Sequence, residues 1–137
     1  MDLQSFLKGR IDRAAAPLAV GDVLVLIAML TVGTLSHVPA EFLTANPLYL
    51  PEVYAPFLIG WLLVAPVVGA YSAGAVETAK SSVPLAIRSW IPAAAIGFVL
   101  RAFVFSGGAA PVFVAIILVT GALALGVWRA AYFKIRG

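Results

Sequence analysis

The amino-acid sequence predicts an all-α polytopic membrane protein, a bundle of four transmembrane helices preceded by a short amphipathic helix. The first observation is composition, because the 137 residues are 63% hydrophobic and only 11% charged, with a mean hydropathy of +1.06. A soluble domain is about half apolar and about a quarter charged. The second observation is that the apolar residues are grouped into four long segments. A chain of this length indicates a single integral membrane domain.

The four predicted spans are each just long enough to cross a hydrocarbon core of about 30 Å at a rise of about 1.5 Å per residue. Continuous helices are expected, since lipid offers backbone polar groups no other partner. Prolines are expected at or just before the helix starts, where the missing N–H costs nothing. The predicted spans are residues 17–36, 55–71, 89–105 and 111–127, and the prolines concerned are Pro17, Pro56, Pro84 and Pro111.

The residues before the first span predict a short amphipathic helix on the inner membrane surface. Apolar side chains would share one face of this helix, and Lys8 and Arg10 would point away from it. A frayed tail is the alternative. The first span is expected to be a retained helix rather than a cleaved signal peptide, because it is too long, contains Asp22 and lacks a small-x-small site. The apolar face would be formed by Leu3, Phe6, Leu7 and Ile11.

The basic residues predict the orientation of the chain. With four spans, all lysines and arginines except Arg101 fall on one side of the membrane, whereas His37, Glu41 and Glu52 fall on the other. An excess of lysine and arginine marks the cytoplasmic side, so both termini are expected in the cytoplasm. Because these residues flank apolar runs, no nucleic-acid partner is predicted.

Small residues four positions apart predict where the helices pack closely. In lipid there is little hydrophobic drive between helices, so close approach depends on glycine and alanine. In the first span Gly33 shares a face with Asp22, which predicts that a neighbouring helix approaches there. The spaced pairs in the other spans are Ala65 with Gly69, Ala93 with Gly97, and Ala122 with Gly126.

Asp22 is predicted to form an ion pair within the membrane. It lies about one turn inside the first span, and Arg88 and Arg129 lie at the same inner level of the third and fourth spans. A charge in a bilayer is costly unless it is paired, so Asp22 is expected to pair with Arg88 or Arg129. The functional alternative is a protonatable carboxylate in an ion path.

Arg101 is the centre of a second predicted polar cluster, at the outer level. It shares a helical face with residues that should point into the bundle. Its possible partners are His37, Glu41, Glu52 and the carbonyls of the "SGGAAP" turn. One interpretation is that Arg101 extends toward the outer interface. The other is that it holds an anion or a lipid headgroup.

No catalytic or metal-binding motif is visible in the sequence. The absence of cysteine excludes disulfides, thiolate catalysis and cysteine-ligated metals. His37 and Glu41 have helical spacing, but a single histidine makes a protein-built metal site improbable. There is no glycine-rich phosphate loop and no nucleophile elbow. We therefore expect no cofactor, no metal and no enzymatic activity.

Several stretches, together covering nearly the whole chain, resemble haloarchaeal members of a family of small membrane proteins, the domain-of-unknown-function family 3054. These stretches are "GDVLVL" with "GTLSH", "APFLIGW" with "APVVGAY", "ETAKSSVPLAIRSWIPAA", "LRA" and "LGVWRAAYFK". The resemblance implies four membrane helices and an archaeal plasma membrane, and it implies no activity. The pattern includes Asp22, His37, Trp61, Arg88, Trp90, Arg101 and Trp128.

Three classes of function are consistent with the sequence. The expected function is that of a non-catalytic accessory or assembly subunit, because the ionisable residues lie near the ends of the spans. The first alternative is a homo-oligomeric channel or transporter for a small solute or ion. The second is a protein that binds or modifies lipids. The expected partners are the lipid bilayer and either further copies of this chain or another membrane protein.

Overall fold

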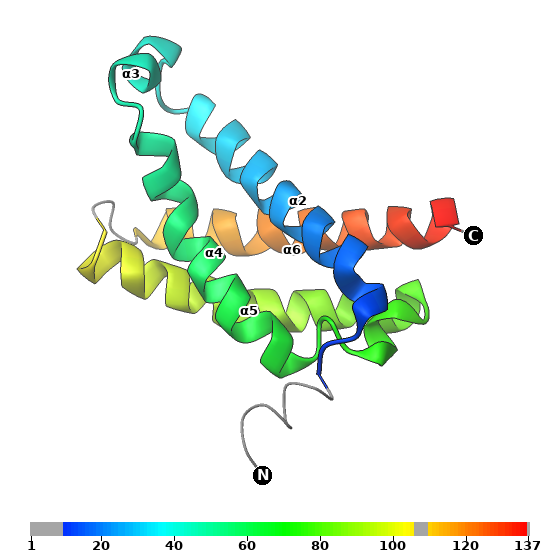
Figure 1. The fold of residues 1–137 in the computed structure, drawn as a ribbon. Helices are drawn as coiled ribbons and strands as arrows, with labels where there is room; N and C mark the ends of the chain where they lie inside the picture. Colours follow the sequence, from blue (N-terminus) through cyan, green and yellow to red (C-terminus); the bar gives the residue numbers. More distant parts are fainter. Residues whose placement is uncertain (1–9, 106–109, 137) are drawn as a thin grey trace.

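The computed structural model describes residues 10–105 and 110–136, and over these residues four helices are long and apolar enough to cross a membrane (Figure 1). They are α2 (Ala16–Leu35), α4 (Tyr49–Val68), α5 (Ala79–Phe103) and α6 (Pro111–Arg136). Short helices occupy the connections: η1 (Arg13–Ala15), α3 (Ala40–Ala45) and η2 (Ala73–Val76). The predicted all-α membrane fold is confirmed. Most of the predicted amino-terminal helix lies outside the described residues.

The four long helices form two hairpins. The α2–α4 hairpin is closed by α3, and the α5–α6 hairpin lies across it (Figure 1). Helix α4 packs on α5, α5 on α6, and α6 on α2. The two hairpins diverge toward α3 (Figure 1). We call this end of the bundle the α3 end, and the opposite end, where η2 joins α4 to α5, the η2 end.

The helices do not coincide with the predicted spans. Helix α5 begins at Ala79, because the side chain of Thr78 caps it by accepting a hydrogen bond from the Ser81 N–H. Pro56 and Pro84, expected at helix starts, instead lie inside α4 and α5. That expectation was wrong because it equated the start of an apolar run with the start of a helix, and a helix can extend beyond the hydrocarbon.

Closest packing occurs between α4 and α5, where backbone meets backbone. A Cβ atom on Gly60 would lie 2.2 Å from the carbonyl oxygen of Ala93, and one on Gly97 would lie 2.5 Å from the Phe57 ring. The predicted pair of Ala93 and Gly97 therefore lies at this contact. A Cβ on Gly126 would make only ordinary contacts, the nearest being a side-chain atom of Val83 at 3.6 Å.

Two predicted packing glycines have a different environment. Among the described residues no atom lies within 4 Å of a Cβ built on Gly33, so none of the described helices approaches α2 there, contrary to the expectation. The reason is that the two hairpins diverge at the α3 end (Figure 1). Gly69 ends α4 with a left-handed φ of 106°, a conformation that glycine adopts without steric cost. The remaining predicted packing residues, Ala65 and Ala122, are buried and partly buried.

A continuous series of aromatic rings fills the centre of the bundle. Neighbouring ring centroids lie 5.1–6.5 Å apart, the spacing of favourable offset and edge-to-face pairs. The rings come from the η2 connection and three of the helices, so the column ties the two hairpins together. In order from the η2 end to the α3 end, the aromatic column consists of Tyr71, Trp61, Trp90, Phe57, Phe98 and Phe113.

Substitution of Gly60 by alanine is predicted to destabilise the protein. The added methyl group would meet the Ala93 carbonyl, and overpacking of this kind costs about 1–3 kcal/mol. A lower Tm in detergent, measured by thermal unfolding, would show this. Gly126→Ala is the matched control, because its methyl group has room and alanine favours helix. Equal Tm values for the two variants would contradict a backbone contact at Gly60.

Candidate functional site

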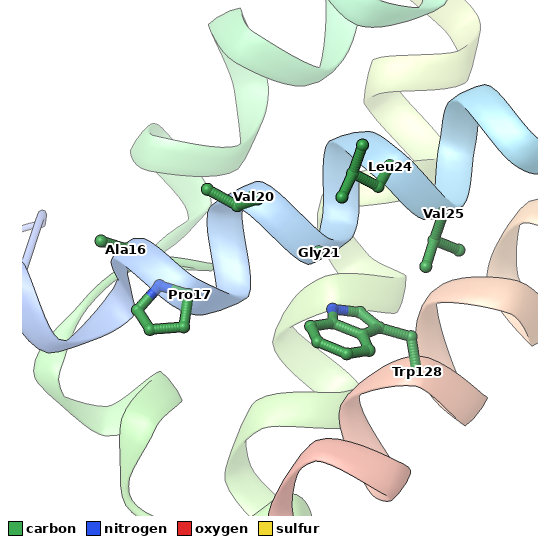
Figure 2. A pocket seen from close by; sticks show the side chains of 7 residues that line it. All are labelled: Ala16, Pro17, Val20, Gly21, Leu24, Val25 and Trp128. Atoms are coloured by element: carbon green, nitrogen blue, oxygen red, sulfur yellow. The ribbon is translucent and has the colours of Figure 1, made fainter.

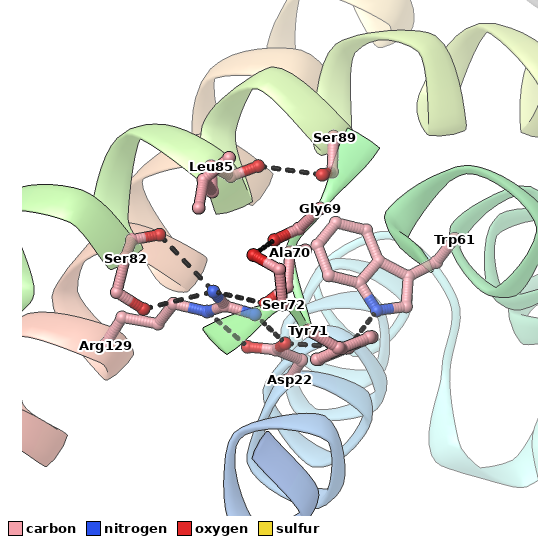
Figure 3. A network of polar contacts seen from close by, with 10 residues as sticks. All are labelled: Asp22, Trp61, Gly69, Ala70, Tyr71, Ser72, Ser82, Leu85, Ser89 and Arg129. Carbon is pink, nitrogen blue, oxygen red and sulfur yellow. Dashed lines mark hydrogen bonds and ion pairs between the residues drawn. The ribbon is translucent and has the colours of Figure 1, made fainter. Parts of the chain in front are cut away.

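A buried ion pair joins α2 to α6 near the η2 end. Asp22 and Arg129 are both 0% exposed. The Arg129 Nη2 donates to Asp22 Oδ2 at 2.5 Å, and its Nε donates to Oδ1 at 3.2 Å (Figure 3). This two-bond geometry matches the planar guanidinium to the planar carboxylate, which is the strongest form of a charged hydrogen bond.

The same guanidinium also binds the other two helical segments. Its Nη1 donates to the Ala70 carbonyl at 3.1 Å, and to the hydroxyl and the carbonyl of Ser82 at 3.1 and 3.3 Å (Figure 3). Ala70 follows α4 and Ser82 belongs to the first turn of α5. A single side chain of α6 therefore contacts α2, the end of α4 and the start of α5.

Tyr71 extends this network into the aromatic column. Its hydroxyl donates to Asp22 Oδ2 at 2.8 Å and accepts from the Trp61 indole N–H at 2.7 Å (Figure 3). The Arg129 guanidinium carbon lies 5.6 Å from the centre of the Tyr71 ring. Burial, reinforced by the negative charge of Asp22, raises the pKa of Tyr71 well above its usual range. The hydroxyl therefore stays protonated and remains a donor.

The turn after α4 places Ala70 and Tyr71 in the bundle. The left-handed Gly69 reverses the chain, and the Ala70 N–H donates back to the Ala65 carbonyl at 2.9 Å. The Asp12 N–H donates to the Tyr71 carbonyl at 2.7 Å, so the segment before α2 fixes this turn from outside. We call the set Asp22, Trp61, Ala70, Tyr71, Ser82 and Arg129 the η2-end network.

An apolar groove of about 590 Å³ lies beside the network, between α2 and α6 (Figure 2). The Trp128 indole covers Gly21 so closely that a Cβ there would lie 1.8 Å from the ring. The Trp128 N–H faces the Asp22 carboxylate but has no partner at hydrogen-bond geometry among the described residues. The groove is lined by Ala16, Pro17, Val20, Gly21, Leu24, Val25 and Trp128.

Of the two predicted partners, the structure places Arg129 and not Arg88 beside Asp22. Arg88 is exposed, because it lies on the side of α5 opposite its buried face. Depth alone could not separate the two arginines, since the choice depends on which face of each helix meets α2. Tyr71 and Ser82 were missed, although a tyrosine at the end of the predicted span, two residues after Gly69, was a usable signal.

The predicted outer cluster is divided between a cleft and the surface. Arg101 and His37 both line a cleft of about 440 Å³ at the α3 end, whereas Glu41 is exposed on α3 and does not line it. The Arg101 guanidinium lies 4.7 Å from the centre of the Phe113 ring, and Tyr49 lines the same cleft. Arg101 thus lies where the aromatic column meets this cleft.

Among the described residues, neither site has a group of metal ligands, and the two buried serines near the η2 end contact groups that cannot act as a base. Within the described ranges no three histidine, cysteine, aspartate or glutamate side chains are grouped as metal ligands. The Ser89 hydroxyl donates to the Leu85 carbonyl of its own helix at 2.7 Å (Figure 3). The Ser82 hydroxyl accepts from Arg129, a cation that cannot act as a base.

Comparison with known proteins gives one family match. The model of a family described as "Protein of unknown function (DUF3054)" matches residues 19–132, which include both ends of the bundle. No curated protein and no solved structure matches the chain.

Loss of either charge of the buried pair is predicted to destabilise the protein strongly. Asp22→Asn leaves the Arg129 cation uncompensated, and Arg129→Gln leaves the carboxylate uncompensated. Breaking a buried pair in this way costs about 3–5 kcal/mol. The double variant should cost less than the sum of the single variants, because the second substitution removes the charge that the first leaves unpaired.

Equilibrium unfolding of the wild-type protein, the two single variants and the double variant in mild detergent measures the coupling between Asp22 and Arg129. Arg88→Gln is the matched control, since it removes the same charge from an exposed position and should change stability by no more than about 0.5 kcal/mol. Strict additivity of Asp22→Asn and Arg129→Gln would contradict the pair.

Proposed function

The chain belongs to the family described as protein of unknown function (DUF3054), and from this premise we propose that it is a non-catalytic accessory or assembly subunit of a membrane complex. The observation that carries the proposal is that side chains of the same chain fill the interior of the bundle. The aromatic column occupies the centre of the bundle, and the buried ion pair uses its polar groups on other parts of the same chain. Function is therefore assigned to the outward-facing surfaces.

A structural role for Asp22 is supported by its surroundings. Both of its oxygens accept hydrogen bonds from Arg129, and one also accepts from Tyr71. A carboxylate that relays protons must lose and regain its charge, and each loss would leave Arg129 buried without its counterion. We therefore assign Asp22 to assembly of the bundle rather than to an ion path.

Permeation through a single copy is disfavoured by the same interior. Trp61 and Trp90 are fully buried at the centre, and their indole N–H groups donate to Tyr71 and to the carbonyls of Ile117 and Leu118. An aqueous path along the axis would need polar side chains or water in their place. Permeation along the interfaces between several copies is the remaining transport alternative.

Native mass spectrometry tests this proposal directly. The protein is extracted at its natural level in mild detergent, and the mass of the intact assembly is measured. A defined complex with a different membrane protein is the expected result. A closed ring containing only this chain would contradict the proposal and would direct the work to flux assays across reconstituted vesicles.

We further propose that the η2 end faces the cytoplasm of a plasma-membrane protein. Support comes from charge: the η2 end has most of the basic residues, whereas Glu41 and Glu52 lie at the α3 end. The haloarchaeal origin implied by the resemblance stays a prediction. The basic residues at the η2 end are Arg10, Arg13, Lys80, Arg88, Arg129, Lys134 and Arg136.

Labelling of single cysteines tests this orientation without removal of any native cysteine, because the chain has none. Glu41→Cys and Glu77→Cys place thiols at exposed positions near opposite ends. In intact cells a membrane-impermeant maleimide should label Glu41→Cys only, and permeabilised cells should label both. Labelling of Glu77→Cys in intact cells would reverse the orientation.

A further inference from the structure

The cleft at the α3 end combines an apolar floor with a cationic side chain. Leu30, Val53 and Ile117, contributed by α2, α4 and α6, are at most 7% exposed and line it. Arg101 reaches the same space from the last turn of α5. The volume of about 440 Å³ lies within the range of about 300–1,000 Å³ that small-ligand pockets occupy.

The cleft is open toward the outer surface of the bundle. Val112 and Ile116 line it and are 72% and 51% exposed, so one wall continues into the surface that the hydrocarbon contacts. Gly33 forms part of another wall, and within the described part of the chain no atom lies within 4 Å of where its Cβ would be. A hydrocarbon chain can therefore lie along α2 without displacing a side chain.

The polar groups of the cleft match an anion. Among the described residues that line it there is no carboxylate, whereas Arg101, His37 and Tyr49 can all donate hydrogen bonds. The Phe113 ring, 4.7 Å from the Arg101 guanidinium carbon, orients the guanidinium. Because a guanidinium has five N–H donors in a planar fork, it can bind a phosphate while it makes other contacts.

We propose that the α3-end cleft binds one anionic phospholipid from the adjacent leaflet. The phosphate would accept hydrogen bonds from Arg101, and one hydrocarbon chain would lie over Leu30, Val53 and Ile117. This inference does not depend on the proposed subunit function, because it concerns a site on one copy of the chain and needs no partner protein.

Lipid titration of the delipidated protein in mild detergent, followed by native mass spectrometry, tests the proposal. The probe is dioleoyl phosphatidylglycerol, and diacylglycerol with the same chains is its phosphate-free counterpart. One phosphatidylglycerol should bind saturably. Diacylglycerol should bind at least about tenfold more weakly, because the charge-assisted hydrogen bonds are lost.

Two variants remove the two halves of the site separately. Arg101→Gln removes the cation, and Gly33→Leu fills the cleft with a side chain that has open space around its Cβ. Each should raise the Kd for phosphatidylglycerol by at least about tenfold. The matched controls are Arg88→Gln, an exposed arginine outside the cleft, and Ala28→Leu, an exposed small residue of α2 outside the cleft.

Three results would overturn the proposal. The first is a wild-type Kd in both Arg101→Gln and Gly33→Leu proteins with unchanged Tm. The second is an equal loss of binding in the control variants, which would indicate non-specific attraction. The third is competition by glycerol 3-phosphate at the same concentrations as the lipid, which would indicate a site for a free phosphate compound rather than for a lipid.

Discussion

The Arg129 guanidinium in the interior of the bundle constrains the position of every other helix. A cation in hydrocarbon costs at least about 2.5–3.5 kcal/mol unless it is paired. Arg129 is paired with Asp22 of α2, the Ala70 carbonyl after α4 and Ser82 of α5. A shift of α6 by one turn, or a different arrangement of the helices around α6, would remove all of these partners of Arg129 together. The network thus disfavours alternative packings, which is a more general effect than the energy of any one bond.

The two ends of the bundle differ in how completely they are closed. At the η2 end, a turn fixed by Gly69 and the backbone contact of Asp12 with Tyr71 seals the network. At the α3 end the hairpins diverge and leave the cleft beside Arg101 (Figure 1). The aromatic column connects the two, from Tyr71 to Phe113. A charged ligand of a single copy is therefore expected at the α3 end, because the groove beside the η2-end network is lined by apolar residues.

Sequence reasoning reached part of the candidate site. It placed Asp22 inside the bundle with an arginine of matching depth, because an isolated charge in lipid has so few alternatives. It missed Tyr71, since a tyrosine near a membrane boundary is ordinarily an interfacial residue. It assigned Gly33 to helix packing, yet none of the described residues covers that surface. Spacing along one helix shows which residues share a face, but not whether another helix covers it.

The sequence by itself determined the class of the protein, the number of its membrane helices and the residues whose burial requires a partner. Hydrophobicity and the need to satisfy backbone groups in lipid act locally along the chain, so these features are readable from it. Only the tertiary structure decided that Asp22 pairs with Arg129 rather than Arg88, and that Arg101 borders a cleft. Those outcomes depend on how each helix is rotated and tilted against its neighbours, which side-chain packing between distant segments sets.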